Sequence, residues 1–500
     1  MTAETSSAST VAIIGTGFGG LGMAWQLKQA GIDSLVIFEK ADEVGGTWRE
    51  NRYPGAGCDV PSHLYSFSFE SHYPWAWRYA RQPEILDYLR HCSRKFDLLR
   101  HIRFRTAVEG ADFDATRGVW RIRLAGGGVH EARFLISAVG QLHRPAYPRI
   151  PGGDHFAGKA FHSAHWDHGY ELKGKTVAVI GTGASAVQFV PEIAKQVKQL
   201  YLYQRTPGWT IPKVERPISP FMRGLLNRLP VIEKLDRLRI YAITELLACA
   251  YMGHRWLERL VTGLAKFQLW RQVRDPALRR RLTPDFPVGC KRILLSNDWY
   301  PALTRTNVEV VSEAVQALEP KGVRTADGKL REVDAVIYGT GFAATEFLAP
   351  MQIRGLGGRE LREQWRGGAE AYLGISVSGF PNLFLLYGPN TNVGSGSIVH
   401  MLESQQRYIG QLIAAQRADG WRYADLRPEV QAEFVAEVQR RSAESTFEGS
   451  CQSWYKTAEG RNTNNWIGLM REYRRRTARP DLAHYQLAGA QAPTSAGQSA

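Results

Sequence analysis

Short apolar runs that end in glycine recur along this chain. Residues 11–14 are apolar and followed by Gly15, and residues 34–38 form a second apolar run. Runs of this length, rich in β-branched residues and bounded by turns, are typical of buried parallel strands. Residues 175–180 repeat the first pattern about 165 residues further on, and a helical stretch and the run 199–203 follow. The pattern predicts two strand–glycine–helix–strand units.

The stretch between residues 216 and 287 has a different pattern. Leucines and arginines recur there at helical spacing, and strand signals are missing, which predicts a helical insertion. Strand signals return at residues 307–311 and 335–338. Residues 1–9 and 486–500 are small and polar, and we expect both to be disordered tails.

The first glycine motif is Gly15, Gly17 and Gly20, in the order G-x-G-x-x-G between a predicted strand and a predicted helix. The first glycine permits a tight turn, the second lets the backbone approach a pyrophosphate, and the third lets helix and strand pack closely. Glu39 ends the next strand, where a carboxylate accepts the ribose hydroxyls and repels a 2′-phosphate. This unit is predicted to bind FAD or NAD(H), not NADP(H).

The second motif is G-x-G-x-x-A, formed by Gly181, Thr182, Gly183, Ser185 and Ala186. Its second strand ends in Arg205 and Thr206 in place of an acid. A guanidinium can bind a 2′-phosphate with two hydrogen bonds, so this unit is predicted to prefer NADPH. The alternative is that Arg205 only pairs with a surface carboxylate.

Two dinucleotide sites in one chain indicate electron transfer from NADPH to a flavin. A disulfide reductase would need two close cysteines, but the five cysteines include no C-x-x-C pair. The same spacing argues against a disulfide framework and a metal site. Oxygen is then the expected electron acceptor.

Two further motifs carry a resemblance to a known family. The pattern F-x-G-x-x-x-H-x-x-x-W-[PD] is met by Phe156, Gly158, His162, Trp166 and Asp167. The pattern G-G-x-W-x-x-x-x-Y-P-G-x-x-x-D is met from Gly45 to Asp59. The chain resembles the type I Baeyer–Villiger monooxygenases, within the class B flavoprotein monooxygenases.

The resemblance implies an NADPH- and O₂-dependent FAD enzyme that converts ketones to esters or lactones through a C4a-peroxyflavin, with sulfoxidation as a further activity. The expected substrate is a small organic ketone or sulfide. The alternatives are an N- or S-oxidising flavin monooxygenase, an uncoupled NADPH oxidase or flavin reductase, and a flavoprotein without catalysis. The implied FAD domain is residues 10–142 and 335–480, and the implied NADP domain is residues 150–215 and 288–334.

The resemblance also implies site residues. Arg292 would stabilise the peroxide and the developing oxyanion, Asp59 would orient Arg292, and Lys291 would add a contact to the 2′-phosphate. Ordinary surface cations and a turn aspartate are the alternatives. His162 and its motif are expected at a hinge between the domains, not as a general base. Further residues expected near the cofactors are Lys40, Gly46, Thr47, Trp48, Val108, Gly341, Asn390 and Trp454.

The formal net charge of +15 fits a solvated surface and the binding of anionic cofactors, and attraction to an anionic membrane stays open. No nucleic-acid-binding module and no obligate protein partner are evident. The N-terminus lacks a basic start and an apolar core, and no apolar run approaches the roughly 20 residues of a membrane span. We expect a cytoplasmic protein without a transmembrane segment.

Overall fold

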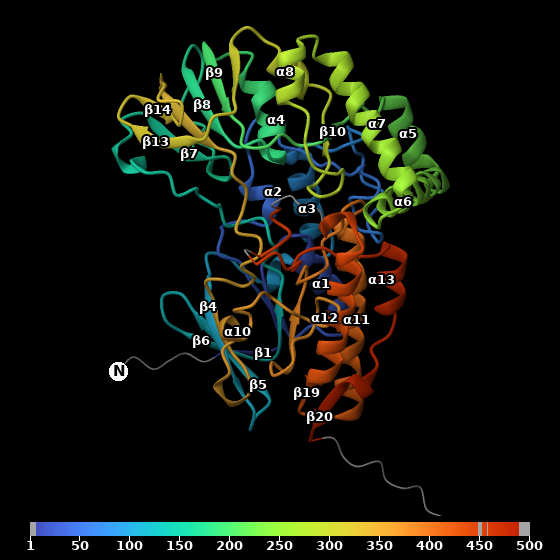
Figure 1. The fold of residues 1–500 in the computed structure, drawn as a ribbon. Coiled ribbons are helices and arrows are strands. Elements are labelled where there is room, and N and C mark those ends of the chain that lie inside the picture. The colour runs from blue at the N-terminus through green and yellow to red at the C-terminus, as the bar shows by residue number, and fades with distance from the viewer. Residues whose placement is uncertain (1–6, 449–452, 458, 490–500) are drawn as a thin grey trace, which may run out of the picture.

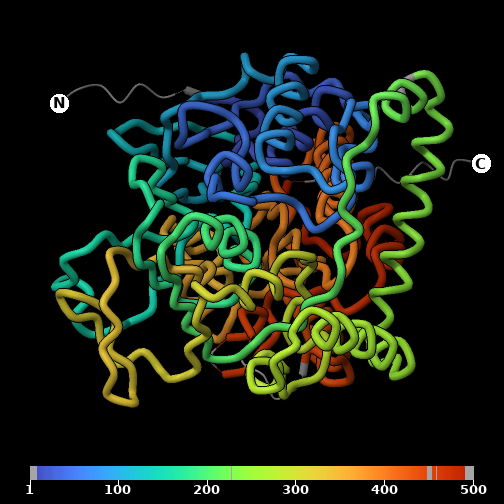
Figure 2. The backbone as a smooth tube through the Cα atoms, turned by 90° about the horizontal axis from the view of Figure 1, so that it is seen from above, coloured from blue at the N-terminus to red at the C-terminus, as the bar shows by residue number. Residues whose placement is uncertain are grey.

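The computed structural model describes residues 7–448, 453–457 and 459–489. Its helices and strands form two α/β units, one above the other in Figure 1, with a group of helices beside the upper unit. The colours in Figure 1 show that the chain passes from the first unit to the second and returns to the first, and Figure 2 shows the helices of residues 216–287 along one side of the molecule. The predicted α/β fold class is confirmed.

The first unit contains an eight-stranded sheet in the order β17-β4-β5-β6-β1-β2-β3, with β18 paired to β6. Its strands are β1 (Ser7–Ile14), β2 (Leu35–Phe38), β3 (Ile102–Arg103), β4 (Val108–Asp114), β5 (Val119–Leu124), β6 (Val129–Ser137), β17 (Gln352–Arg354) and β18 (Leu383–Leu385). Its helices are α1 (Phe18–Gln29), α2 (Thr47–Glu50), α3 (Gln82–Lys95), α10 (Leu361–Gln364), α11 (Ile398–Asp419), α12 (Pro428–Ala443) and α13 (Met470–Arg476). An antiparallel pair, β19 (Tyr423–Leu426) and β20 (Tyr485–Ala488), lies at its lower end in Figure 1.

The second unit contains a five-stranded parallel sheet in the order β12-β9-β8-β16-β7. Its strands are β7 (Lys159–His162), β8 (Thr176–Ile180), β9 (Gln199–Tyr203), β12 (Val308–Val311) and β16 (Ala335–Tyr338), with helices α4 (Ala184–Ile193) and α9 (Trp299–Leu303). Beside it lie the antiparallel strands β13 (Val315–Glu319), β14 (Gly322–Thr325) and β15 (Leu330–Glu332), and the pair β10 (Thr210–Ile211) and β11 (Leu294–Leu295). Short 3₁₀ turns occur at Leu99–His101, Gly153–His155, Ser163–His165, Leu356–Gly358, Thr446–Glu448 and Leu482–His484.

The predicted insertion is helical. It contains α5 (Pro220–Arg228), α6 (Pro230–Tyr251), α7 (Arg255–Gln272) and α8 (Pro276–Arg281). Among the described residues, no helix is both long and apolar enough to cross a membrane.

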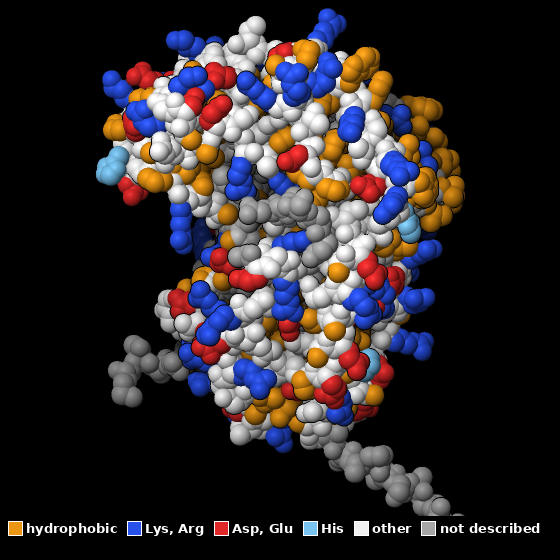
Figure 3. Space-filling model, in the orientation of Figure 1, with side chains coloured by type: hydrophobic (Ala, Val, Ile, Leu, Met, Phe, Trp, Pro, Cys, Tyr) orange, Lys and Arg blue, Asp and Glu red, His pale blue; other side chains and the backbone are white. Residues whose placement is uncertain are grey.

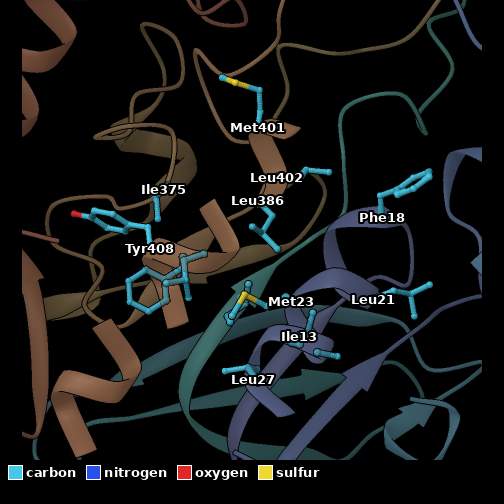
Figure 4. Close-up of a cluster of buried hydrophobic side chains, with 14 of the residues drawn as sticks. Ile13, Phe18, Leu21, Met23, Leu27, Ile375, Leu386, Met401, Leu402 and Tyr408 are labelled. Atoms are coloured by element: carbon cyan, nitrogen blue, oxygen red, sulfur yellow. The ribbon is translucent and has the colours of Figure 1, made fainter. Parts of the chain in front are cut away.

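The core of the first unit forms where α1 and α11 pack over β1. Most apolar residues of β1 and α1 are almost fully buried there, namely Val11, Ala12, Ile13, Ile14, Phe18, Leu21, Met23, Ala24 and Leu27. Burial of such side chains is the main source of stability in a sheet of this kind. Figure 4 shows part of this cluster, with Ile13, Phe18, Leu21, Met23, Leu27, Ile375, Leu386, Met401, Leu402 and Tyr408.

The placement of residues 335–338 corrects a predicted domain boundary. The sequence pattern assigned this strand to the FAD domain, but β16 pairs with β7 and β8 in the second sheet. The sequence of this strand is apolar throughout, as expected of a buried strand in either sheet. Its pairing partners are distant in the chain, so the sequence pattern does not show to which sheet it belongs. The chain returns to the first unit only after Tyr338.

The predicted tails are also shorter than expected. Residues 7–9 belong to β1 and pair with residues 130–132 of β6, and residues 486–488 belong to β20. The prediction of disorder is wrong for these residues, because strand pairing with a distant segment satisfies their backbone hydrogen bonds. The rest of both predicted tails, residues 1–6 and 490–500, lies outside the described residues.

The cysteines differ from the prediction at one position. Cys58, Cys92 and Cys249 are free thiols, whereas Cys290 is disulfide-bonded. The prediction from cysteine spacing, which argued against disulfides, is wrong for Cys290, because spacing in the sequence does not show which thiols the fold brings together.

The glycine turn after β1 generates a testable prediction. A Cβ atom on Gly20 would lie 1.9 Å from the Gly15 carbonyl oxygen, whereas a Cβ on Gly17 would approach nothing closer than Gly46 Cα at 3.8 Å. We therefore expect Gly20→Ala to destabilise the protein by about 1–3 kcal/mol or more, the usual cost of overpacking. Urea unfolding of the cofactor-free protein measures this. Gly17→Ala is the matched control and should unfold like the wild type; equal unfolding midpoints for the two variants would contradict the prediction.

Candidate functional site

A large cavity lies between the two units. Its volume is about 1270 Å³, and both units and the helical insertion contribute to its lining. The second glycine motif, the loop from Thr47 to Pro61 and helix α6 all reach it. Parallel sheets place the carboxyl ends of their strands at one edge, which is where ligands of such folds bind.

Glu39 is buried next to the first glycine motif. Its Oε2 accepts hydrogen bonds from the Thr16 backbone N–H at 3.0 Å and from the Thr16 hydroxyl at 2.6 Å, and its Oε1 accepts from the Ala41 N–H at 2.9 Å. A carboxylate has about four acceptor positions, so one remains for a ribose hydroxyl. The predicted position of Glu39 beside the dinucleotide turn agrees with this geometry.

The second glycine motif meets three polar side chains at the end of β9. The Lys291 ammonium donates to the Thr206 hydroxyl at 2.6 Å, and the Thr182 hydroxyl donates to the Thr206 carbonyl at 3.2 Å. Burial and then the nearby charge of Arg205 hold the pKa of Lys291 below its ordinary value, partly opposed by Asp285. Two cations held this close repel each other, and a bound phosphate would relieve that repulsion.

Arg292 and Asp59 meet inside the cavity. The Arg292 guanidinium lies 3.6 Å from the Asp59 carboxylate, and both residues line the cavity. The Arg292 side chain is 35% exposed, toward this cavity, whereas that of Asp59 is 10% exposed. Burial lowers the pKa of Arg292, but the Asp59 carboxylate together with the neighbouring tyrosines outweighs burial and raises this pKa above its ordinary value. The guanidinium is therefore permanently charged.

Three tyrosines surround Arg292, and the sequence motifs did not indicate them. Burial raises the pKa of Tyr251 and Tyr387 to about 12, against the opposing effect of Arg292, and burial also raises the pKa of Tyr455. Tyr387 donates to the Asn392 side chain at 2.8 Å. Since all three phenols stay neutral, none of them cancels the charge of Arg292, and the Tyr387 hydroxyl already donates its one hydrogen bond to Asn392. Their wide spacing in the sequence leaves no local signal that would have found them.

Gln188 of α4 is a second residue that sequence analysis missed. Its amide N–H donates to the Gly57 carbonyl at 3.0 Å, and its Oε1 accepts from the Tyr53 hydroxyl at 3.0 Å. A Cβ on Gly55 would lie 2.5 Å from the Gln188 carbonyl, so the loop that carries Asp59 packs closely against α4. Gln188 links the two units. It lies three residues after Ser185 of the glycine motif, so the two side chains share one face of α4, and this spacing was the sequence signal that could have identified Gln188.

The fingerprint from Phe156 to Asp167 forms the edge strand β7 and the turn after it. His162 Nδ1 accepts from the Ala164 N–H at 3.1 Å, and burial and then His165 lower the pKa of His162 to about 4. Its ring lies against Tyr147 and Phe342, which belong to the two connections between the units. Gly158 has no room for a Cβ beside Asp334, Trp166 packs on Phe161 and Phe189, and Asp167 pairs with Lys159 at 2.7 Å. A neutral ring at these connections fits a hinge better than a general base.

The other predicted residues separate into two groups. Thr47, Trp48, Gly181, Thr182, Gly183, Ser185, Arg205, Thr206, Gly341 and Trp454 line the cavity with Asp59 and Arg292. Outside that lining lie Gly15, Gly17, Gly20, Glu39, Lys40, Gly46, Val108, Ala186, Lys291 and Asn390.

Several of the second group are nevertheless adjacent to the site. A Cβ on Gly46 would lie 3.1 Å from Gly17 Cα, and Val108 begins a strand two residues after Thr106, which donates to the Glu39 carbonyl. The Asn390 amide instead donates to the Asn462 and Asn465 carbonyls. Its visible role is to hold the chain segment beside the cavity.

The cavity has features that fit FAD and NADP. Asn51 Oδ1 and Gln141 Oε1 are buried acceptors without a hydrogen-bond partner among the described residues, and both residues line the cavity. Unpaired buried polar atoms are costly, and donors of a bound ligand can satisfy them. The glycine turns leave the backbone N–H groups accessible to a pyrophosphate at the N-termini of α1 and α4.

Two dinucleotide units that share one charged cavity are the arrangement of a flavoenzyme with two nucleotide sites. Residues 8–231 match a family model described as flavin-binding monooxygenase-like. A Baeyer-Villiger monooxygenase of Pseudomonas aeruginosa is 44% identical over 479 residues, which cover 95% of this chain and 91% of that protein. The chain therefore belongs to the Baeyer–Villiger monooxygenase family, and the predicted family is confirmed.

Solved structures agree with this assignment. An oxidized steroid monooxygenase bound to NADP has a TM-score of 0.86 at 31% identity, covering 96% of this chain and 100% of its own. An OTEMO complex with FAD and NADP has a TM-score of 0.86 at 28% identity, covering 97% and 100%. These relatives do not favour the alternatives of an N- or S-oxidising enzyme or an uncoupled oxidase.

Replacement of Arg205 tests the assignment of the second glycine unit. Loss of a charged hydrogen bond to a phosphate costs about 1.5–3 kcal/mol, so Arg205→Ala should raise the KM for NADPH about tenfold or more and leave NADH nearly unchanged. Initial rates with both nucleotides measure this. Lys195→Ala, which removes an exposed cation of the same unit, is the control. Equal effects on the two nucleotides would show that Arg205 does not bind the 2′-phosphate.

Proposed function

We propose that Arg292 and Asp59 form the catalytic centre of a Baeyer–Villiger monooxygenase that uses FAD, NADPH and O₂ to convert ketones to esters or lactones. The observation that carries the proposal is the permanently charged guanidinium, 3.6 Å from its carboxylate, inside a cavity reached by both units. When bound, FAD would supply the electron transfer from NADPH and the activation of O₂ that this reaction needs.

The two nucleotide sites are assigned from side-chain chemistry. Glu39 would hold the ribose of FAD, while the backbone of Gly15, Gly17 and Gly20 faces its pyrophosphate. Arg205, Lys291 and Thr206 would bind the 2′-phosphate of NADPH, because two cations and a hydroxyl converge there. The carboxylate of Glu39 would repel that phosphate, so the two sites are not interchangeable.

Arg292 would act on the negative charge that develops on the reacting oxygens. A guanidinium has five N–H donors, and the single contact with Asp59 leaves others directed into the cavity. A fixed cation held inside a protein cavity stabilises such charge more than it would in bulk solvent. The neutral phenol of Tyr251 can donate a further hydrogen bond there.

Asp59 would orient Arg292, and the contacts between the units would position Asp59. Gln188 ties the loop of residues 53–57 to α4, so the carboxylate is set by the same helix whose N-terminus faces the nucleotide. The fingerprint from Phe156 to Asp167 would serve as the hinge, since His162 packs on both connections. Movement between the units would change the distance between Asp59 and Arg292.

Replacement of Arg292 should separate ester formation from NADPH consumption. Arg292→Ala should still oxidise NADPH and reduce O₂, but it should release H₂O₂ in place of ester, with ester formation about 100- to 1000-fold slower. Product analysis by gas chromatography together with a peroxide assay measures both. Some slowing of flavin reduction is compatible, since the nicotinamide lies in the same cavity.

Arg292→Lys is the conservative control, because it keeps the charge and loses the fork of N–H donors. It should recover part of the ester formation. If Arg292→Ala makes ester at the wild-type rate, Arg292 has no part in the oxygen-transfer reaction.

A further inference from the structure

Helix α7 has two apolar faces, and one of them is exposed. Leu257, Val261, Ala265 and Leu269 are buried against the protein. The opposite face carries large apolar side chains that are 44–63% exposed, namely Trp256, Leu260, Leu264, Phe267 and Trp270. A contiguous exposed surface of large apolar residues is unusual in a soluble domain and marks an interaction site.

The exposed apolar side chains of α7 alternate with cations. Apart from Gly263, its other exposed positions are Arg255, Arg259, Lys266 and Arg271. None of these four forms an ion pair within the described part of the chain. Tryptophan and leucine beside unpaired Lys and Arg are the composition of helices that lie in the surface of a bilayer.

The neighbouring helices extend the same surface. On α6, the positions of Val231, Leu235, Leu238 and Leu246 fall on one stripe, and these side chains are 52–65% exposed. Phe221, near the start of α5, is 80% exposed. Figure 3 shows apolar side chains with Lys and Arg among them along the edge of the molecule formed by these helices. We call this surface, over α5, α6 and α7, the docking face.

The net charge of the insertion favours an anionic partner over a second copy of this chain at the docking face. Residues 216–287 contain 14 Lys and Arg and 6 Asp and Glu, a net charge of +8 out of +15 for the whole chain. Two copies that met through this face would bring two such charges together, which opposes association. An anionic phospholipid surface attracts the same charge and offers an apolar interior to the Trp and Leu side chains.

We propose that the docking face binds the surface of an anionic phospholipid bilayer. On the basis of the proposed function, we also expect the docked enzyme to take its ketone substrate from the bilayer. One side of α6 lines the active-site cavity through Ile240, Thr244 and Leu247, while its other side belongs to the docking face. Ile243 both lines the cavity and is 50% exposed. A docked enzyme therefore presents its cavity wall to the bilayer, which favours apolar ketones dissolved in lipid.

Vesicle flotation tests the docking. The FAD-loaded enzyme is mixed with vesicles of phosphatidylcholine alone, or with vesicles that also contain anionic phosphatidylglycerol, and the bound fraction is measured. We expect binding to the anionic vesicles and little to the neutral ones, with a decrease at high salt. Failure to bind anionic vesicles at low salt would overturn the proposal.

Three variants separate the apolar and the charged contributions. W256S/F267S/W270S removes exposed aromatic side chains, and R255Q/R259Q/K266Q removes unpaired cations of the same helix. K173Q/K198Q/K321Q is the matched control, because it removes three exposed cations from the second unit and changes the net charge equally. We expect both α7 variants to lose vesicle binding and the control to keep it. Equal losses in the control would indicate adsorption by net charge, and full binding by the aromatic variant would exclude insertion of the apolar side chains; either result overturns the proposal.

Two further measurements keep the outcomes distinct. Sedimentation velocity reports whether the wild type is a dimer that the aromatic variant dissociates, a result that would assign the face to a second copy and overturn bilayer docking. Turnover of water-soluble cyclohexanone should be the same in the wild type and all variants, whereas turnover of 2-tridecanone carried in anionic vesicles should fall in both α7 variants. Absence of turnover on every ketone would contradict the proposed function while leaving the flotation result intact.

Discussion

The Arg292 guanidinium holds its charge in the cavity between the units, where Asp59, from the other unit, faces it. The unpaired burial of a guanidinium is costly, and a carboxylate at 3.6 Å offsets that cost while leaving donors free for the cavity. The pair also requires that both units be in place, since neither unit contains both partners. The surrounding phenols, the loop of residues 53–57 and helix α4 all serve to define the place where these two charges meet.

The connection between the units explains why several motif residues lie away from the cavity. Strand β16 belongs to the second sheet, yet the chain leaves it directly for the first unit, past Gly341 and Phe342. The outgoing connection runs beside it, with the Ala146 N–H donating to the Gly341 carbonyl at 2.9 Å. His162 packs against both segments as a neutral ring. The fingerprint from Phe156 to Asp167 therefore lies where the two units are joined, away from the cavity lining.

The helical insertion has two surfaces with different environments. Its inner side completes the cavity, and its outer side carries exposed aromatic and cationic side chains. A helix such as α6 that is apolar on both sides has to bury one side against the protein, and the other side remains available to a partner. The same element therefore links the chemistry of the cavity to the environment from which an apolar substrate comes.

The sequence alone determined the features that depend on neighbouring residues. Gly15, Gly17 and Gly20 with Glu39 indicate a dinucleotide site, because turn, strand and carboxylate lie within one short unit. Arg205 and Thr206 likewise lie close in the sequence to the second glycine motif, so the expected preference for NADPH could also be predicted from the sequence. The Baeyer–Villiger family was likewise readable from two motifs of contiguous residues, and the relatives confirm it.

The tertiary structure alone decided what depends on distant segments. It placed residues 335–338 in the second sheet, brought Lys291 to Thr206, and gathered Tyr251, Tyr387 and Tyr455 around Arg292. It also decided which side of α7 is covered, since helical spacing shows two apolar stripes without saying which one the protein buries. Pairing of strands and packing of side chains are contacts between residues far apart in the chain, and no local pattern encodes their partners.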